Sequence, residues 1–136
     1  MSGPTGNCLW VAILQDGQVA LGNTRMPDCT VELDRSTYEV FVGWLAGSEQ
    51  PATVNARGQF KLGSLGVQLS LTSDVTSFMQ PDGSDFVLDD KEIEYAVQAA
   101  LSGAMGFDSL PPGGRRAVFG KQIIVEEYAP VVAADV

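Results

Sequence analysis

The amino-acid sequence predicts a mainly β fold, a β-sandwich or barrel with one amphipathic α-helix packed on it. The chain of 136 residues contains 15 glycines, well above the average usage of about 7%, which indicates many turns between short strands. Short apolar or alternating runs are separated by turn residues along most of the chain. One later segment, residues 89–106, has helical periodicity instead.

The first part of the chain is typical of three strands. Residues 8–14 form a continuous apolar run, as a buried strand does. Asp16-Gly17 follows and predicts a hairpin turn into Val19–Leu21, because glycine supplies the positive φ of a tight turn. Residues 29–34 alternate between apolar and polar side chains, which predicts a half-buried strand.

Residues 36–46 fit two different structures. Ser36 and Glu39 have the spacing of a helix capping box, and Gly47 would suit a helix C-cap. The aromatic and valine side chains of the same segment also alternate with a period of two, and Gly43 and the valines disfavour a helix. We therefore expect a strand here.

The middle and end of the chain add strands and one helix. Strands are expected over residues 52–56, 59–62 and 67–72, before a polar, turn-rich stretch at 73–85 and a brief apolar run at 86–88. Asp89 or Asp90 caps the helix and Gly106 ends it. The apolar helix face is expected to consist of Ile93, Ala96, Val97, Ala100, Leu101, Ala104 and Met105.

One domain is expected for the whole chain, residues 1–136, without an internal repeat. An N-terminal arm (1–7) precedes the strand-rich part (8–88), the helix (89–106) and one long final strand (115–128). Aromatic residues at strand positions normally bury. The expected core aromatics are Trp10, Tyr38, Phe41, Trp44 and Phe60.

The composition argues against most catalytic and nucleic-acid functions. The chain contains no histidine, which is the commonest acid–base group and metal ligand. Its net charge is −9 and it has only 8 basic residues, so binding to nucleic acid or an anionic membrane is not expected. Cys8 and Cys29 lack metal-box spacing and are expected to be buried thiols, with a disulfide between them as the alternative if their strands are neighbours. We expect no enzyme activity, no catalytic residue, no cofactor and no metal.

Charged and polar segments supply the candidate interaction residues. Acids dominate residues 74–94, and we expect them to serve turns and the helix N-terminus on a solvated face. A calcium site at Asp82 and Asp85 with Asp89 or Asp90 is the alternative. If copies of the chain abut, this acidic turn could meet an arginine pair on another copy. The candidate interaction residues are Ser2 and Asn7 of the arm, Asp82, Asp85, Arg115 and Arg116.

A family resemblance supports an assembly role. The run of residues 6–14, the Asp16-Gly17 turn, Val19–Leu21 and the alternating strand at 29–34 resemble small phage virion proteins of the tail-tube and head-decoration class. The resemblance covers the first third of the chain and the order strand, helix, strand. It implies a β-sandwich or barrel that self-assembles into rings or binds a capsid lattice.

The sequence thus predicts a non-enzymatic structural protein, a phage tail-tube, connector or capsid-decoration component that acts through protein–protein contacts. Its expected partners are further copies of itself or other virion proteins, with the virion, assembled in the host cytoplasm, as its location. The alternative is a monomeric, cytoplasmic β module that binds a small ligand in a pocket lined by Trp10, Trp44 and Phe60. A small hydrolase is a third class, without a motif to support it.

Overall fold

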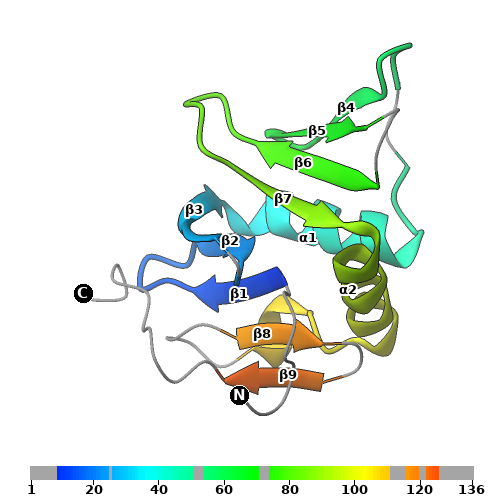
Figure 1. Cartoon of the computed structure of the whole chain (residues 1–136). Coiled ribbons are helices and arrows are strands. Elements are labelled where there is room, and N and C mark those ends of the chain that lie inside the picture. Colours follow the sequence, from blue (N-terminus) through cyan, green and yellow to red (C-terminus); the bar gives the residue numbers. More distant parts are fainter. Residues whose placement is uncertain are drawn as a thin grey trace.

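The computed structural model describes residues 9–24, 26–50, 54–70, 74–110, 116–119 and 122–125. In chain order the elements are β1 (Leu9–Ile13), β2 (Val19–Asn23), β3 (Met26–Leu33), α1 (Arg35–Ala46), β4 (Gln59–Leu62), β5 (Leu65–Leu69), β6 (Val75–Met79), β7 (Asp85–Asp89), α2 (Asp90–Ser102), a 3-10 turn (Phe107–Ser109), β8 (Arg116–Phe119) and β9 (Gln122–Val125) (Figure 1). The mainly β class is confirmed, but this part of the chain holds two α-helices rather than one.

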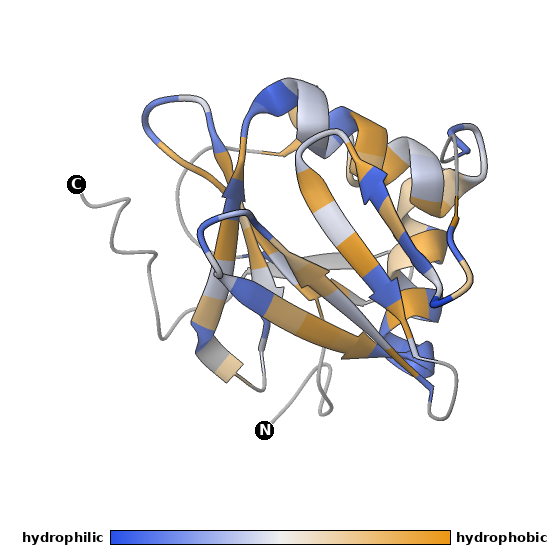
Figure 2. Cartoon of the chain, turned by 90° about the horizontal axis from the view of Figure 1, so that it is seen from above, coloured by the Kyte–Doolittle hydropathy of each residue, from blue (hydrophilic) through white to orange (hydrophobic). Residues whose placement is uncertain are grey.

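The strands form two antiparallel sheets. Sheet A has the order β3-β2-β1-β8-β9, and sheet B, which lies above it in Figure 1, has the order β4-β5-β6-β7. The expected hairpin at Asp16-Gly17 joins β1 to β2, with Gly17 at φ 87°. Polar and apolar residues alternate along the strands of sheet B (Figure 2), because one face packs on the helices and the other faces outward.

Contrary to the expectation from sequence, the fold contains an internal repeat. Three strands followed by a helix occur twice, as β1–β3 with α1 and as β5–β7 with α2. Asp34 and Asp89 are the helix N-caps, and Gly47 and Gly103 end the two helices in the left-handed conformation. The strand after each helix is exchanged: β4 follows α1 but pairs with β5, and β8 follows α2 but pairs with β1. Each unit therefore completes the sheet of the other.

The strand expected at residues 36–46 is wrong, because this segment is helix α1. Asp34, rather than Ser36, caps it, and its side chain accepts a hydrogen bond from Thr37 N–H at 2.8 Å. The helical periodicity places Tyr38, Phe41 and Leu45 on one buried face. Burial of that face outweighs the weak helix propensity of the valines and glycine.

One hydrophobic core lies between the helices and the two sheets. Phe41 and Trp44 of α1 contact Phe78 and Phe60 of sheet B, with ring centroids 5.6 Å apart in each pair. Helix α2 packs on β1, β7 and β8. The expected core aromatics are confirmed, with Trp10, Tyr38, Phe41 and Phe60 buried and Trp44 partly buried.

The helix at residues 90–102 is shorter than the helix expected at 89–106, and it buries a different face. It ends at Gly103, three positions before Gly106, because Gly103 adopts φ 85° and its N–H bonds back to Ala100. The buried face holds Ala96, Ala99 and Ala100, whereas Leu101 is 65% exposed. Rotation of the face brings Glu92 inside, where it closes the capping box with Asp89.

Three other strand expectations need correction. The single long strand expected at 115–128 is wrong, because β8 and β9 are two separate strands that pair antiparallel. The stretch 73–85, expected to be turns, contains β6, which pairs with β5 and β7. The described residues of the strand expected at 52–56, which are 54–56, lie outside the strands.

Side-chain amides connect the edges of the two sheets, where β3 and β7 lie against each other. The side chain of Gln80 accepts from the backbone N–H of Glu32 at 2.9 Å and donates to its carbonyl. Asn23, at the end of β2, donates from Nδ2 to the carbonyl of Val87 in β7 at 2.8 Å. These bonds replace a backbone ladder and hold sheet B at a fixed position against sheet A.

Candidate functional site

The outer face of sheet B is the most distinctive open surface of the described chain. Strand register aligns Lys61, Gly66, Met79 and Asp85 in one row across β4, β5, β6 and β7. The neighbouring positions Phe60, Val67, Phe78 and Phe86 point inward and are buried. The row therefore carries a cation at one end, an anion at the other, and a glycine beside a methionine in the middle.

A hollow of about 450 Å³ lies over this face. Gly66 contributes no side chain to its lining, and Met79 beside it is 38% exposed. A Cβ built on Gly66 would lie 3.5 Å from Met79 Cγ, an ordinary contact distance. Lys61 is the one charged residue of the lining, which otherwise consists of Asn55, Gln59, Phe60, Ser64, Gly66, Val67, Gln68, Met79, Gln80 and Pro81.

Amide hydrogen bonds fix the rim of the hollow next to β4. Asn55 Oδ1 accepts from the N–H groups of Arg57 and Gln59 at 2.9 and 3.0 Å. Gln68 Nε2 donates to the carbonyls of Arg57 and Leu69 at 2.7 and 2.9 Å. The loop before β4 is thus tied to β5, so the hollow has a preformed wall.

The matching face of sheet A is filled. In the internal repeat, Trp10 of β1 occupies the position that Gly66 occupies in β5. Trp10 is fully buried and covers Gly22 of the neighbouring strand, where an added Cβ would come within 2.7 Å of the indole. It packs in a second apolar cluster with Ala12, Leu14 and Ala20. The two repeats therefore differ at this position: Trp10 fills the face of sheet A, whereas Gly66 leaves the face of sheet B open.

Two of the residues expected from sequence to make contacts lie at the β6–β7 connection, and one of them belongs to this face. Asp85 begins β7 at the end of the row. Asp82 lies in the turn before it and accepts a hydrogen bond from Ser84 N–H at 2.8 Å, which lowers the pKa of its carboxyl group. Ser2, Asn7 and Arg115 lie outside the described residues.

Arg116 begins β8, within the final strand that the sequence predicted at residues 115–128. It is half-buried on β8, paired with Val11 in sheet A, and its Nε has no hydrogen-bond partner among the described residues. Asp85 begins β7 of the other sheet, and Asp82 lies in the turn before it. Within one chain the structure thus separates the acidic turn from Arg116.

Two of the acids proposed as calcium ligands, Asp82 and Asp89, accept hydrogen bonds from backbone N–H groups. Asp89 accepts a hydrogen bond from Glu92 N–H at 2.8 Å as the α2 cap. Asp82 closes its own turn, as described above. Across the described ranges, no group of three or more Asp, Glu, Cys or His side chains is placed to hold a metal ion. Cys29 is a free, half-buried thiol, and Cys8 lies outside these ranges.

The aromatic pocket suggested for a ligand is not formed by its three expected residues. Trp10 belongs to the outer cluster of sheet A, while Trp44 packs on Phe60 in the main core. Phe60 alone of the three lines the hollow. Sequence reasoning missed Lys61, Gly66 and Met79, because their common row depends on strand register.

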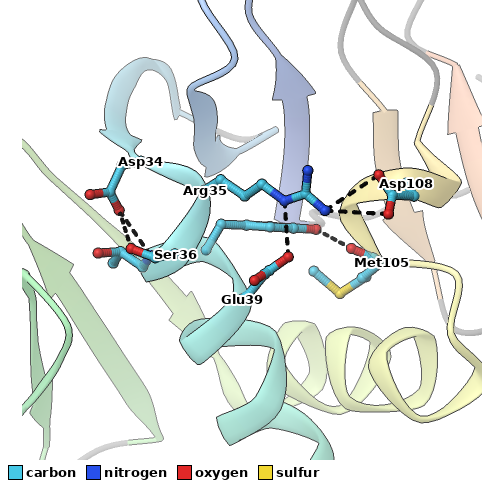
Figure 3. Close-up of polar contacts among 8 residues, drawn as sticks. Asp34, Arg35, Ser36, Glu39, Met105 and Asp108 are labelled. Carbon is cyan, nitrogen blue, oxygen red and sulfur yellow. Dashed lines mark hydrogen bonds and ion pairs between the residues drawn. The ribbon is translucent and has the colours of Figure 1, made fainter.

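A charged cluster at the start of α1 has a structural explanation. Arg35 pairs with Glu39 at 3.0 Å and with Asp108 at 3.3 Å (Figure 3), and its guanidinium lies 4.2 Å from the centroid of the Phe107 ring. Tyr38 donates from its hydroxyl to the Met105 carbonyl nearby at 2.5 Å. The Arg35–Asp108 ion pair and the Tyr38–Met105 hydrogen bond hold α1 against the segment after α2.

Comparisons with family models, with curated proteins and with solved structures find no match to this chain. None of the described helices is long and apolar enough to cross a membrane.

Proposed function

We propose that this chain is a non-enzymatic assembly protein that acts by contacting other protein chains, in the first place copies of itself. The outer face of sheet B is the observation that carries the proposal. It combines a preformed hollow of about 450 Å³ with an exposed methionine and an exposed lysine. Methionine adapts its shape to a partner surface and is favoured at protein interfaces.

The distribution of charge supports a specific contact between copies of the chain rather than non-specific association. The net charge of −9 keeps copies of the chain apart at long range. A self-contact must therefore place opposite charges together, and the row from Lys61 to Asp85 offers both signs on one face. The finer assignment to a phage virion rests on the resemblance of the N-terminal segments and stays a prediction.

The experiment is size-exclusion chromatography with light scattering on the whole chain, at several protein concentrations and two salt concentrations. The proposal predicts a mass above that of one chain which rises with protein concentration. It also predicts that the association persists at high salt, because salt screens the long-range repulsion between copies of net charge −9 beyond about 8 Å at physiological ionic strength. A single-chain mass under every condition would contradict the proposal.

A second candidate function is the binding of a small ligand in the same hollow. Its volume of about 450 Å³ falls in the usual range of ligand pockets, about 300–1,000 Å³. This function predicts a ligand that raises the melting temperature while the mass of one chain is unchanged.

A further inference from the structure

We propose that the outer face of sheet B is a self-complementary interface onto which a second copy of the chain docks face to face. In it, Met79 of each copy enters the hollow over Gly66 of the other, and Lys61 of each pairs with Asp85 of the other. The proposal rests on the assembly function above and specifies the surface that performs it.

The order of residues in the row makes the face complementary to itself. Lys61, Gly66, Met79 and Asp85 lie side by side on four successive strands, so the ends of the row are about 14 Å apart at the usual strand spacing. A two-fold axis parallel to the strands, midway between two stacked faces, reverses the row on the second copy. Lysine then faces aspartate, and glycine faces methionine, twice in each dimer.

The two docked faces are complementary in shape as well as in charge. The hollow and the exposed methionine lie next to each other on adjacent strands. The same rotation therefore places each protruding side chain opposite a hollow. Stacked sheets lie about 10 Å apart, a gap that methionine and lysine side chains can span from either side. The filled face of sheet A, with its buried Trp10, offers no such hollow at the equivalent position.

Face-to-face docking also agrees with the hydrogen bonding of the nearby strand edges. The backbone N–H and carbonyl of Gln59 on β4 bond to Asn55, and those of Glu32 on β3 bond to the Gln80 side chain. At these residues the groups that edge-to-edge pairing would use are already occupied. The outer face of sheet B therefore offers a better contact than these two edges.

The expected dimer is weak because the face is small. Four strands of four or five residues cover about 15 Å in each direction. Such a contact belongs to the class of interfaces below about 1,200 Å² that serve transient association. Dissociation constants should be measured by sedimentation velocity at physiological salt, which screens the repulsion between like-charged copies, up to several hundred micromolar protein.

The test reverses each charge of the pair separately and then combines the two variants. Lys61→Glu and Asp85→Lys should each weaken self-association about tenfold or more, because both charge contacts of a homodimer become repulsive. An equimolar mixture of the two variants should associate about as tightly as the original chain, because opposite charges then meet at both contacts. Gly66→Leu, which fills the hollow, should weaken association in the original chain and in the mixture of the two charge variants.

Matched controls separate this contact from a general charge effect. Lys91→Glu and Glu94→Lys make the same charge changes on exposed positions of α2 and should leave the dissociation constant unchanged. Circular dichroism shows whether each variant is folded. If the original chain associates but the sheet B variants behave like their controls, this interface is wrong and the assembly function stands. A chain that stays monomeric throughout overturns both.

Discussion

Replacing Asn23 with alanine should destabilise the protein strongly, because this side chain joins the two repeats. Asn23 is fully buried, and its Nδ2 donates to the Val87 carbonyl at 2.8 Å and to Glu92 Oε1 at 3.0 Å. A hydrogen bond to a carbonyl contributes about 1 kcal/mol and one to a charged group about 1.5–3 kcal/mol. Asn23→Ala should therefore lower the free energy of unfolding by about 3 kcal/mol.

Urea denaturation followed by circular dichroism measures this free energy. Gln98→Ala, which removes an amide from an exposed position of α2, should stay within about 0.5 kcal/mol of the original protein. A double-mutant cycle of Asn23→Ala with Glu92→Ala should show a coupling of about 1 kcal/mol or more. A loss for Asn23→Ala no larger than that for Gln98→Ala would refute the claim that this amide holds the sheets together.

Three further predictions concern the core, the repeat and pH. Tyr38→Phe leaves a buried carbonyl without its hydroxyl donor and should cost about 1–3 kcal/mol in thermal or urea unfolding; an unchanged stability would contradict that bond. Gly22→Ala should destabilise by about 1–3 kcal/mol, because its methyl would overlap the Trp10 ring, while Gly66→Ala should be nearly neutral; equal losses would contradict the difference between the two faces. The N–H of Thr37 lowers the pKa of Asp34 below its usual 3.8, so Asp34 stabilises the fold above about pH 4 and that contribution is lost as pH falls through the lowered pKa; Asp34→Asn should flatten the stability curve there, and an identical acid profile would show that this cap does not titrate as argued.

Local sequence signals predicted the elements whose structure depends on near neighbours. The Asp16-Gly17 turn and the capped helix after Asp89 are of this kind, since turn chemistry and capping act over a few residues. Helix α1 was missed because its aromatic residues satisfy both the helical and the strand period. Contacts such as Phe41 with Phe78 decide between them, and these depend on a strand far along the chain.

The candidate site was predicted only at Asp85. Its surface turn and charge were visible in the sequence. The relation of Asp85 to Lys61 was not, because the two residues are aligned only by the register of three strand pairs. The repeat was missed for a similar reason: its two copies share caps and strand order, but the equivalent positions Trp10 and Gly66 differ in size and chemistry.

Methyl NMR of chains labelled at methionine can show which surface of the molecule takes part in self-association. Met79 on sheet B is 38% exposed and Met26 on sheet A is 41% exposed, so they are a matched pair within one molecule, while Met105 is fully buried. When the protein concentration is raised, we expect the Met79 methyl resonance to shift and broaden while the Met26 and Met105 resonances stay in place. Shifts at Met26 alone, or at none of the three, would contradict self-association through the outer face of sheet B.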